Sequence, residues 1–190
     1  MTTQRTPAAF VTESVLRPAM FLSREDIRRI YEGARDRAVA EARAALGPGV
    51  RLTVRGLVPS DLGETNEQWA DQTGTTTNAF ENTIIATQTI ANERFCGIYG
   101  VLYTGDAQVV RVLRITVKSQ IRAHWDLSPI ISDDTRLDAR TAYALSPFTI
   151  PQNTSVLIEQ YLNIPVAAAN AVEIAYLGVT VEKAGRTIDV

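Results

Sequence analysis

The feature that most constrains this chain is a period of two in its apolar residues, which begins at residue 50. Apolar and polar side chains alternate within each segment, as expected for strands with one buried face. No helical segment separates them, which favours antiparallel sheets over a strand-helix-strand fold. The segments are VRLTVRGLV from Val50, IIATQTI from Ile84, RFCGIYGVLYT from Arg94, QVVRVLRITVKSQIRAHWDL from Gln108, TAYALSPFTI from Thr141, TSVLIEQYL from Thr154 and AVEIAYLGVTVEK from Ala171.

The stretch from Arg111 to Trp125 has the clearest alternation. We expect it to bend near Ser119 or Gln120 and to form two strands, one face of which is basic. The apolar parity holds Leu113, Ile115, Val117, Ile121, Ala123 and Trp125, and the opposite parity holds Arg114, Thr116, Lys118, Gln120, Arg122 and His124.

Two glycine positions predict local geometry. Gly105 and Asp106 predict a two-residue hairpin between the segments on either side of them. In the last segment the apolar parity shifts at Gly178, which predicts a glycine-centred bulge or bend.

A helix and an arm precede the strands. Ser23 is a good N-cap, and Asp26 at the third helical position completes a short capping box. Gly47 supplies a C-terminal stop, so a helix is predicted over 23–47. Residues 1–22 contain two prolines and no apolar period, and they are predicted to form an extended arm.

Residues 48–190 are predicted to form one β-sandwich domain that contains a long polar loop at 59–83. With 190 residues, of which 45% are hydrophobic, the chain is long enough for one domain with a substantial core. The predicted fold class is mainly β. We expect an antiparallel, jelly-roll-like sandwich of about eight strands, preceded by the arm and one long helix.

Composition argues against several functional classes. The formal net charge of -2 is not the basic balance of a dedicated nucleic-acid binder. Cys96 is the only cysteine and His124 the only histidine, so an intrachain disulfide and a multi-histidine metal site are excluded. No segment has the pattern of a signal peptide or a membrane span, so a soluble protein without cofactors is expected.

Patterns for catalysis or metal binding are weak. His124 beside Asp126 would serve as an oriented base only with an activated serine, and the chain has no G-x-S-x-G motif. The acidic segment containing Asp126, Asp133, Asp134 and Asp138 lacks the spacing of an EF-hand, so a polar loop is expected there. We therefore do not expect an enzyme.

Two groups of residues are candidate contacts with other subunits. The arm carries more apolar side chains than a disordered tail usually does. The basic face has three open interpretations: a solvated surface ion-paired with Glu159, Glu173 or Glu182, a subunit contact, or a surface for nucleic acid. The candidate subunit contacts are Phe10, Val15, Leu16, Phe21, Arg114, Lys118 and Arg122.

The polar loop 59–83 is too long for an ordinary connection, and loops of this length are often functional. Trp69, Asn78 and Phe80 are its candidate ligand contacts, because rings stack on sugars and amides bind hydroxyl groups. Tyr99 and Tyr103 are further candidates, and ordinary packing is the alternative for all five residues.

The segments SPFTIPQNTSVLIEQYL and AVEIAYLGVTVEKAGRTI, with the preceding arm and helix, resemble the single-jelly-roll structural proteins of virus and bacteriophage particles. The resemblance implies a non-enzymatic virion protein, namely a capsid, decoration or minor head or tail component. Such a protein assembles in the host cytoplasm with copies of itself or with other virion proteins. Arg5 and Arg17 are the only basic residues in 1–22, unlike the basic arm of many coat proteins, so direct nucleic-acid binding is not expected. No membrane partner is expected either.

Two other functions remain open. The first is a carbohydrate- or receptor-binding β-sandwich module, because jelly rolls also occur in lectins. The second is a hydrolase whose site the sequence does not identify.

Overall fold

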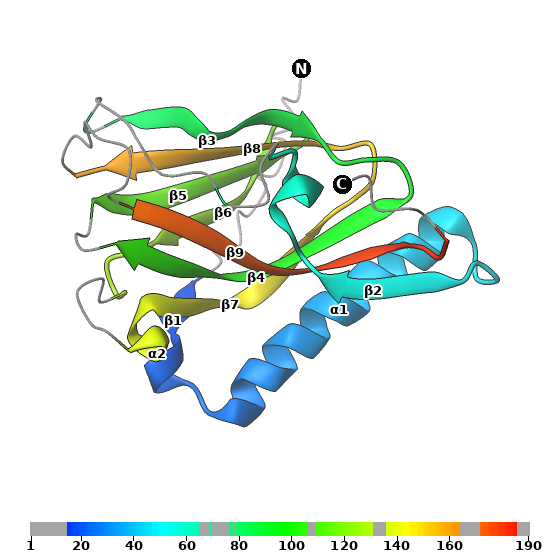
Figure 1. Cartoon of the computed structure of the whole chain (residues 1–190), viewed down its shortest axis with the longest axis horizontal. Helices are drawn as coiled ribbons and strands as arrows, with labels where there is room; N and C mark the ends of the chain where they lie inside the picture. The colour runs from blue at the N-terminus through cyan, green and yellow to red at the C-terminus, as the bar shows by residue number, and fades with distance from the viewer. Residues whose placement is uncertain are drawn as a thin grey trace, which may run out of the picture.

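The structure is a computed structural model that describes residues 15–64, 69, 77, 79–105, 109–130, 136–163 and 172–185 (Figure 1). No helix in these ranges has the length and apolarity needed to cross a membrane. In chain order the elements are β1 (Leu16–Pro18), η1 (Ala19–Phe21), α1 (Arg24–Leu46), β2 (Leu52–Gly56), η2 (Pro59–Leu62), β3 (Phe80–Thr89), β4 (Arg94–Gly105), β5 (Val110–Val117), β6 (Gln120–Asp126), α2 (Leu137–Arg140), β7 (Thr141–Ile150), β8 (Ser155–Leu162) and β9 (Val172–Lys183).

The strands form two antiparallel sheets that pack face to face, with α1 lying across the outside of one of them (Figure 1). The five-stranded sheet has the order β1-β7-β4-β9-β2, and the four-stranded sheet has the order β3-β8-β5-β6. The predicted mainly-β, antiparallel, sandwich-like fold is confirmed. The described residues contain nine strands where about eight were predicted, and β1, in the predicted arm, pairs with β7.

The core between the sheets follows the predicted parity of the strands. Leu113, Ile115 and Trp125 of the four-stranded sheet are completely buried, as are Ile98 and Tyr103 of the five-stranded sheet. Burying a large aliphatic side chain contributes about 1.5–3 kcal/mol to folding. The apolar side chains that the alternation assigns to the buried faces therefore make the main favourable contribution to the free energy of folding.

The predicted bend in the stretch from Arg111 to Trp125 is confirmed. β5 and β6 pair as a hairpin, and the two residues between them, Lys118 and Ser119, both have positive φ (51° and 60°). Positive φ at both central positions is typical of the type I′ turn, whose twist matches that of antiparallel strands.

The predicted parity is wrong at Ile121, which is 42% exposed. The β5–β6 register moves from Ile115–Ala123 to Thr116–Ile121, so Arg122 has no partner in the ladder. A bulge of this kind interrupts the alternation, so that residues on its two sides no longer share the face that an unbroken strand would give them. Ile121 therefore shares the outer face with Thr116.

The predicted hairpin at Gly105 and Asp106 is also wrong. Residues 106–108 lie outside the described ranges, but β4 belongs to the five-stranded sheet and β5 to the four-stranded sheet. The chain therefore crosses between the two layers at this point, whereas a hairpin would have kept β4 and β5 paired.

The predicted helix is confirmed at Arg24–Leu46, with Gly47 as its C-cap. The capping box is complete, because the Ser23 hydroxyl accepts a hydrogen bond from the Asp26 amide and the Asp26 carboxylate accepts one from the Ser23 amide, both at 3.1 Å. The helix packs its alanine stripe onto β4 and β9. The buried members of the stripe are Ile30, Ala34, Ala38 and Ala42.

The parity shift at Gly178 comes from the close contact between α1 and the sheet. The bulge predicted in β9 is not found there. The register irregularity lies across the ladder in β4, where Tyr99 is the additional residue between the pairs Ile98–Gly178 and Gly100–Leu177. The apolar side chains of β9 face the other sheet before Gly178 and face α1 after it. The shift in sequence therefore reflects a change in which face of β9 is covered by apolar groups.

Two glycines give a matched test of this packing. A methyl group added at Gly97 would lie 3.0 Å from the Ala34 carbonyl oxygen of α1, whereas one added at Gly33 would meet nothing within 4 Å. We predict that Gly97→Ala destabilises the fold by about 1–3 kcal/mol through overpacking. Gly33→Ala should stabilise it by roughly 0.5–1 kcal/mol through helix propensity. Urea denaturation measures both, and equal effects would contradict the close helix–sheet contact.

Candidate functional site

Two of the predicted candidate residues, Arg114 and Phe80, meet on the outer face of the four-stranded sheet. The carbon centre of the Arg114 guanidinium lies 3.9 Å from the centroid of the Phe80 ring. Arg114 also donates two hydrogen bonds of 2.6 Å to the two carboxylate oxygens of Glu159 on the adjacent strand β8. The predicted cross-strand ion pair with Glu159 is therefore confirmed.

Further rings surround Phe80 on this face. Its centroid lies 5.5 Å from that of Tyr161 and 5.7 Å from that of His124. The strand register causes the grouping, because Phe80 is opposite Tyr161, and Arg114 is opposite His124 on one side and Glu159 on the other. We call this set, Phe80, Arg114, His124, Glu159 and Tyr161, the outer-face cluster.

Sequence reasoning missed Tyr161 as a member of the outer-face cluster. Its signal was present, since Glu159 and Tyr161 have the same parity in β8, but the pairing of β8 with β3 and β5 was not known. The ion pair raises the pKa of Arg114, mainly through its hydrogen bonds to Glu159. The centre of the predicted basic face is thus charge-neutral.

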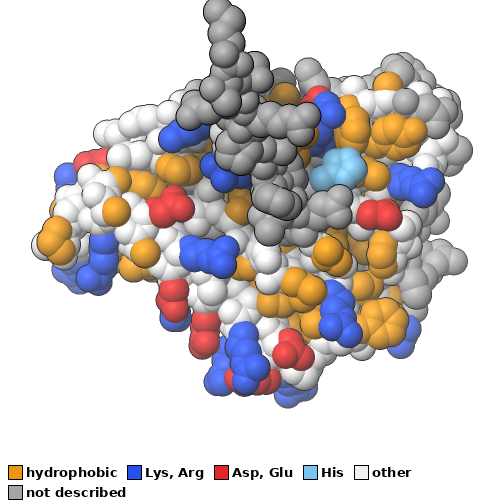
Figure 2. Space-filling model, turned by 180° about the vertical axis from the view of Figure 1, so that it is seen from behind, with side chains coloured by type: hydrophobic (Ala, Val, Ile, Leu, Met, Phe, Trp, Pro, Cys, Tyr) orange, Lys and Arg blue, Asp and Glu red, His pale blue; other side chains and the backbone are white. Residues whose placement is uncertain are grey.

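Seen from the side opposite Figure 1, the molecule shows basic side chains interspersed with hydrophobic and acidic ones (Figure 2). The visible surface has no continuous basic stripe of the kind that binds a nucleic-acid backbone. Of the three interpretations of the basic face, the ion-paired one therefore applies to Arg114. Lys118 and Arg122 lie away from the outer-face cluster, at the β5–β6 turn beside α1, where both line a cavity.

The predicted arm contacts divide into exposed and buried residues. Val15 is 58% exposed and Phe21 64% exposed, but Leu16 is 7% exposed and packs in the core of its own chain, so it is not free to contact a partner. Phe10 lies outside the described residues. Leu16 is buried because β1 pairs with β7, which turns its side chain toward the other sheet.

An exposed apolar corner surrounds the two exposed arm residues. Leu137 of α2 is 68% exposed and Leu145 of β7 is 49% exposed. The elements are neighbours: α2 packs against η1 and β1, and the Leu145 amide donates a 3.1 Å hydrogen bond to the Val15 carbonyl. We call Val15, Phe21, Leu137 and Leu145 the apolar corner.

The predicted ligand loop does not gather its three candidates into one site. Trp69 packs against Tyr176 with ring centroids 5.2 Å apart, at the edge of the core, which is the packing alternative for this residue. Asn78 lies outside the described residues, and Phe80 begins β3 in the outer-face cluster.

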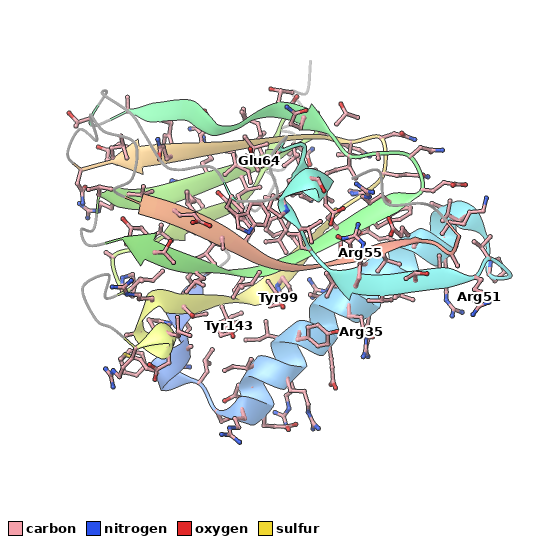
Figure 3. The ribbon with its side chains drawn as sticks, viewed as in Figure 1. Arg35, Arg51, Arg55, Glu64, Tyr99 and Tyr143 are labelled. Atoms are coloured by element: carbon pink, nitrogen blue, oxygen red, sulfur yellow. The ribbon has the colours of Figure 1, made fainter. Side chains whose placement is uncertain are left out.

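The two tyrosine candidates also pack within the fold. Tyr103 is completely buried, and its hydroxyl accepts a 3.0 Å hydrogen bond from the Val109 amide. Tyr99 and Tyr143 lie near each other on β4 and β7 (Figure 3), with parallel rings whose centroids are 6.2 Å apart. Tyr31 of α1 meets Tyr99 edge to face, so these rings join the helix to the sheet.

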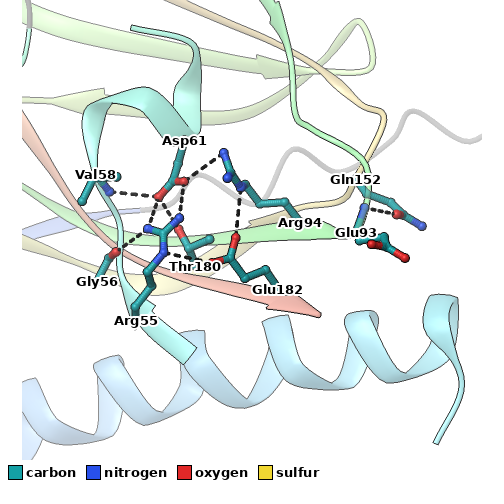
Figure 4. A network of polar contacts seen from close by, with 9 residues as sticks. All are labelled: Arg55, Gly56, Val58, Asp61, Glu93, Arg94, Gln152, Thr180 and Glu182. Atoms are coloured by element: carbon teal, nitrogen blue, oxygen red, sulfur yellow. Dashed lines mark hydrogen bonds and ion pairs between the residues drawn. The ribbon is translucent and has the colours of Figure 1, made fainter. Parts of the chain in front are cut away.

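Sequence reasoning did not find a buried charge network at the end of the sandwich under η2 (Figure 4). Arg55 donates two 2.6 Å hydrogen bonds to Asp61 and one of 3.2 Å to Glu182. Arg94 lies 3.1 Å from an Asp61 oxygen and 3.4 Å from a Glu182 oxygen, and the Thr180 hydroxyl donates to Asp61 at 2.7 Å. Two arginines therefore balance two carboxylates.

Asp61 is the centre of the buried charge network. Burial alone would raise its pKa, but hydrogen bonds from Arg55, Thr180 and the Val58 amide outweigh that effect and hold the pKa below the ordinary 3.8. Each carboxylate contacts both arginines. The network therefore anchors η2 to β2, β4 and β9.

The predicted catalytic and metal-binding residues are not assembled into a site. Among the described residues the side chain of His124 makes only its ring contact with Phe80, and the Asp126 carboxylate accepts a 2.9 Å hydrogen bond from the Ser128 amide. Asp133 and Asp134 lie outside the described residues, and the described part of the chain contains no group of three His, Cys, Asp or Glu able to hold a metal ion.

Comparison of the chain with protein-family models and with curated proteins found no match.

The buried charge network gives a prediction about stability and pH. Asp61→Asn leaves two buried arginines with one carboxylate and should destabilise the fold by about 3–5 kcal/mol. Because the folded-state pKa of Asp61 is lowered, its contribution is present above the unfolded value of 3.8 and is lost as the pH falls through the folded value. Urea denaturation between pH 7 and pH 3 should show a larger loss for the wild type than for the variant, which keeps only its other carboxylates, such as Asp26, whose pKa is also lowered.

Asp36→Asn is the control for this prediction, because Asp36 is exposed on α1 and pairs only with the exposed Arg35. Exposed ion pairs contribute little, so its effect should be much smaller. Equal losses in the two variants would contradict the anchoring role of Asp61.

Proposed function

We propose that the sandwich is a jelly roll and that the protein is a non-enzymatic virion structural protein, which assembles with copies of itself or with other shell proteins. The observation that carries the proposal is the order of strand pairing. β5 pairs with β6, β4 with β7, β3 with β8 and β2 with β9. The chain from β2 to β9 is thus folded back on itself at the β5–β6 turn.

The four pairs alternate between the two sheets. β5–β6 and β3–β8 belong to the four-stranded sheet, and β4–β7 and β2–β9 belong to the five-stranded sheet. A long antiparallel hairpin wrapped in this way is the topology of a jelly roll, which is frequent in viral capsid proteins and in lectins. A fold alone does not assign a function, so the proposal also depends on features of the molecular surface.

The apolar corner supports assembly. Its four side chains are between 49% and 68% exposed and come from η1, α2, β7 and the residue before β1, so segments far apart in sequence contribute exposed apolar groups to the same region of the fold. An exposed apolar surface built from several elements is typical of a protein–protein contact. The corner also adjoins β1, the edge strand that the arm adds to the five-stranded sheet.

A pair of substitutions tests assembly through the apolar corner. We predict that Phe21→Asp with Leu137→Asp shifts the protein from oligomer to monomer, because burying two carboxylates in an apolar contact is costly. Sedimentation velocity of the full chain measures the shift. Ile121→Asp is the control, since Ile121 is exposed on β6, away from the corner. A wild type that stays monomeric at high concentration would contradict the proposal.

The outer-face cluster favours a second candidate function, a carbohydrate- or receptor-binding module. Three rings and a fixed carboxylate–guanidinium pair lie together on the outer sheet face, and rings and polar groups of this kind bind sugars by stacking and by hydrogen bonds to hydroxyl groups. We predict that Phe80→Ala abolishes binding to any glycan detected on an array, while Tyr31→Ala, on the α1 side, leaves it unchanged. Absence of binding by the wild type would remove this candidate.

A further inference from the structure

A surface cavity of about 250 Å³ lies where α1, the β5–β6 turn and the end of β7 meet. Two of its residues, Lys118 and Arg122, are also candidate subunit contacts from the sequence, and they line the cavity together with residues of α1. The lining residues are Arg37, Glu41, Val117, Lys118, Arg122, Phe148, Thr149 and Pro151.

Positive charge is in excess around the cavity. Three cationic side chains, those of Arg37, Lys118 and Arg122, line it together with a single carboxylate, that of Glu41. Within the described part of the chain, neither Lys118 nor Arg122 forms an ion pair of 4.0 Å or less. Glu41 is close enough for both cations to lower its pKa, although burial raises the pKa on balance. The two cations therefore attract Glu41 across a gap.

The three cationic residues reach the cavity from different backbone features, and of their charged groups only the Arg37 guanidinium has a hydrogen bond within the described part of the chain. A guanidinium nitrogen of Arg37 donates a 2.6 Å hydrogen bond to the Pro147 carbonyl, which orients the group and leaves its other donors available. Lys118 lies in the tight turn, and its amide donates to the Ser155 carbonyl at 3.1 Å. Arg122 is the additional residue of the β6 bulge, and bulges redirect side chains in this way.

We propose that this cavity is a binding site for an oxyanion, a phosphate or carboxylate group, which Arg37 and Arg122 bind through guanidinium N–H donors and Lys118 binds as a point charge. Guanidinium groups match the geometry of such anions, and hydrogen bonds between charged partners are stronger than neutral ones. Glu41 opposes the bound anion and so limits its affinity. The site is independent of the assembly function proposed above.

Isothermal titration of the full-chain protein with inorganic phosphate, and separately with citrate, at constant ionic strength tests the site. Saturable binding of at least one probe is expected. Arg122→Gln should weaken binding about tenfold, because one charge-assisted contact is lost. Arg111→Gln is the matched control, since Arg111 is exposed on β5, does not line the cavity and changes the net charge equally. Equal effects of the two variants would show only a general charge effect and would overturn the proposal.

Glu41→Gln gives a result that loss of folding cannot imitate. Removing the carboxylate that faces the anion should tighten phosphate binding several-fold. Unchanged or weaker binding would overturn the proposal, as would the absence of saturable binding of both probes to the wild type. A preference for citrate over phosphate would identify a carboxylate ligand, and the reverse preference a phosphate.

Discussion

The close contact between α1 and the five-stranded sheet is the constraint on which the rest of the structure depends. Ala34 and Gly97 lie so near each other that a single methyl group at Gly97 would be 3.0 Å from the helix backbone. This contact holds the next turns of α1, with Arg37 and Glu41, beside the β5–β6 turn, where they complete the cavity. It also covers the outer face of β9 with apolar groups after Gly178. The inner face of β9 after Gly178 is therefore available to the polar residues of the buried charge network.

The charged residues of this protein are used in two different ways. In the buried charge network, two arginines and two carboxylates neutralise each other and join η2 to the sheet. In the cavity beside α1, three cations meet one carboxylate without forming a close pair with it. The first arrangement is balanced in charge and stabilises the fold. The second leaves cationic donors exposed on the surface, and these are the groups to which the proposed oxyanion would bind.

Much of the fold was predictable because its signals are local. The capping box at Ser23 and Asp26, the bend at Lys118 and Ser119, and the buried parity of Leu113 and Ile115 all depend on neighbours in sequence. The Arg114–Glu159 pair was predictable as well, since opposite charges on the outward parity of two strands only need adjacent strands. The outer-face cluster was found in part. Phe80 and Arg114 were candidates for different roles, and only the register of β3, β5 and β8 brought them together.

By itself the sequence determined most of the strand-forming segments and the long helix, because turn chemistry, capping and periodicity act over a few residues. Only the tertiary structure decided which strands pair and which face of each strand is covered, because these depend on contacts between distant segments. For this reason Gly105 marks a crossing between sheets where a hairpin was predicted, and Leu16 is buried where a subunit contact was predicted. The apolar corner, the buried charge network and the cavity beside α1 arise in the same way, since each joins at least three segments that no local pattern connects.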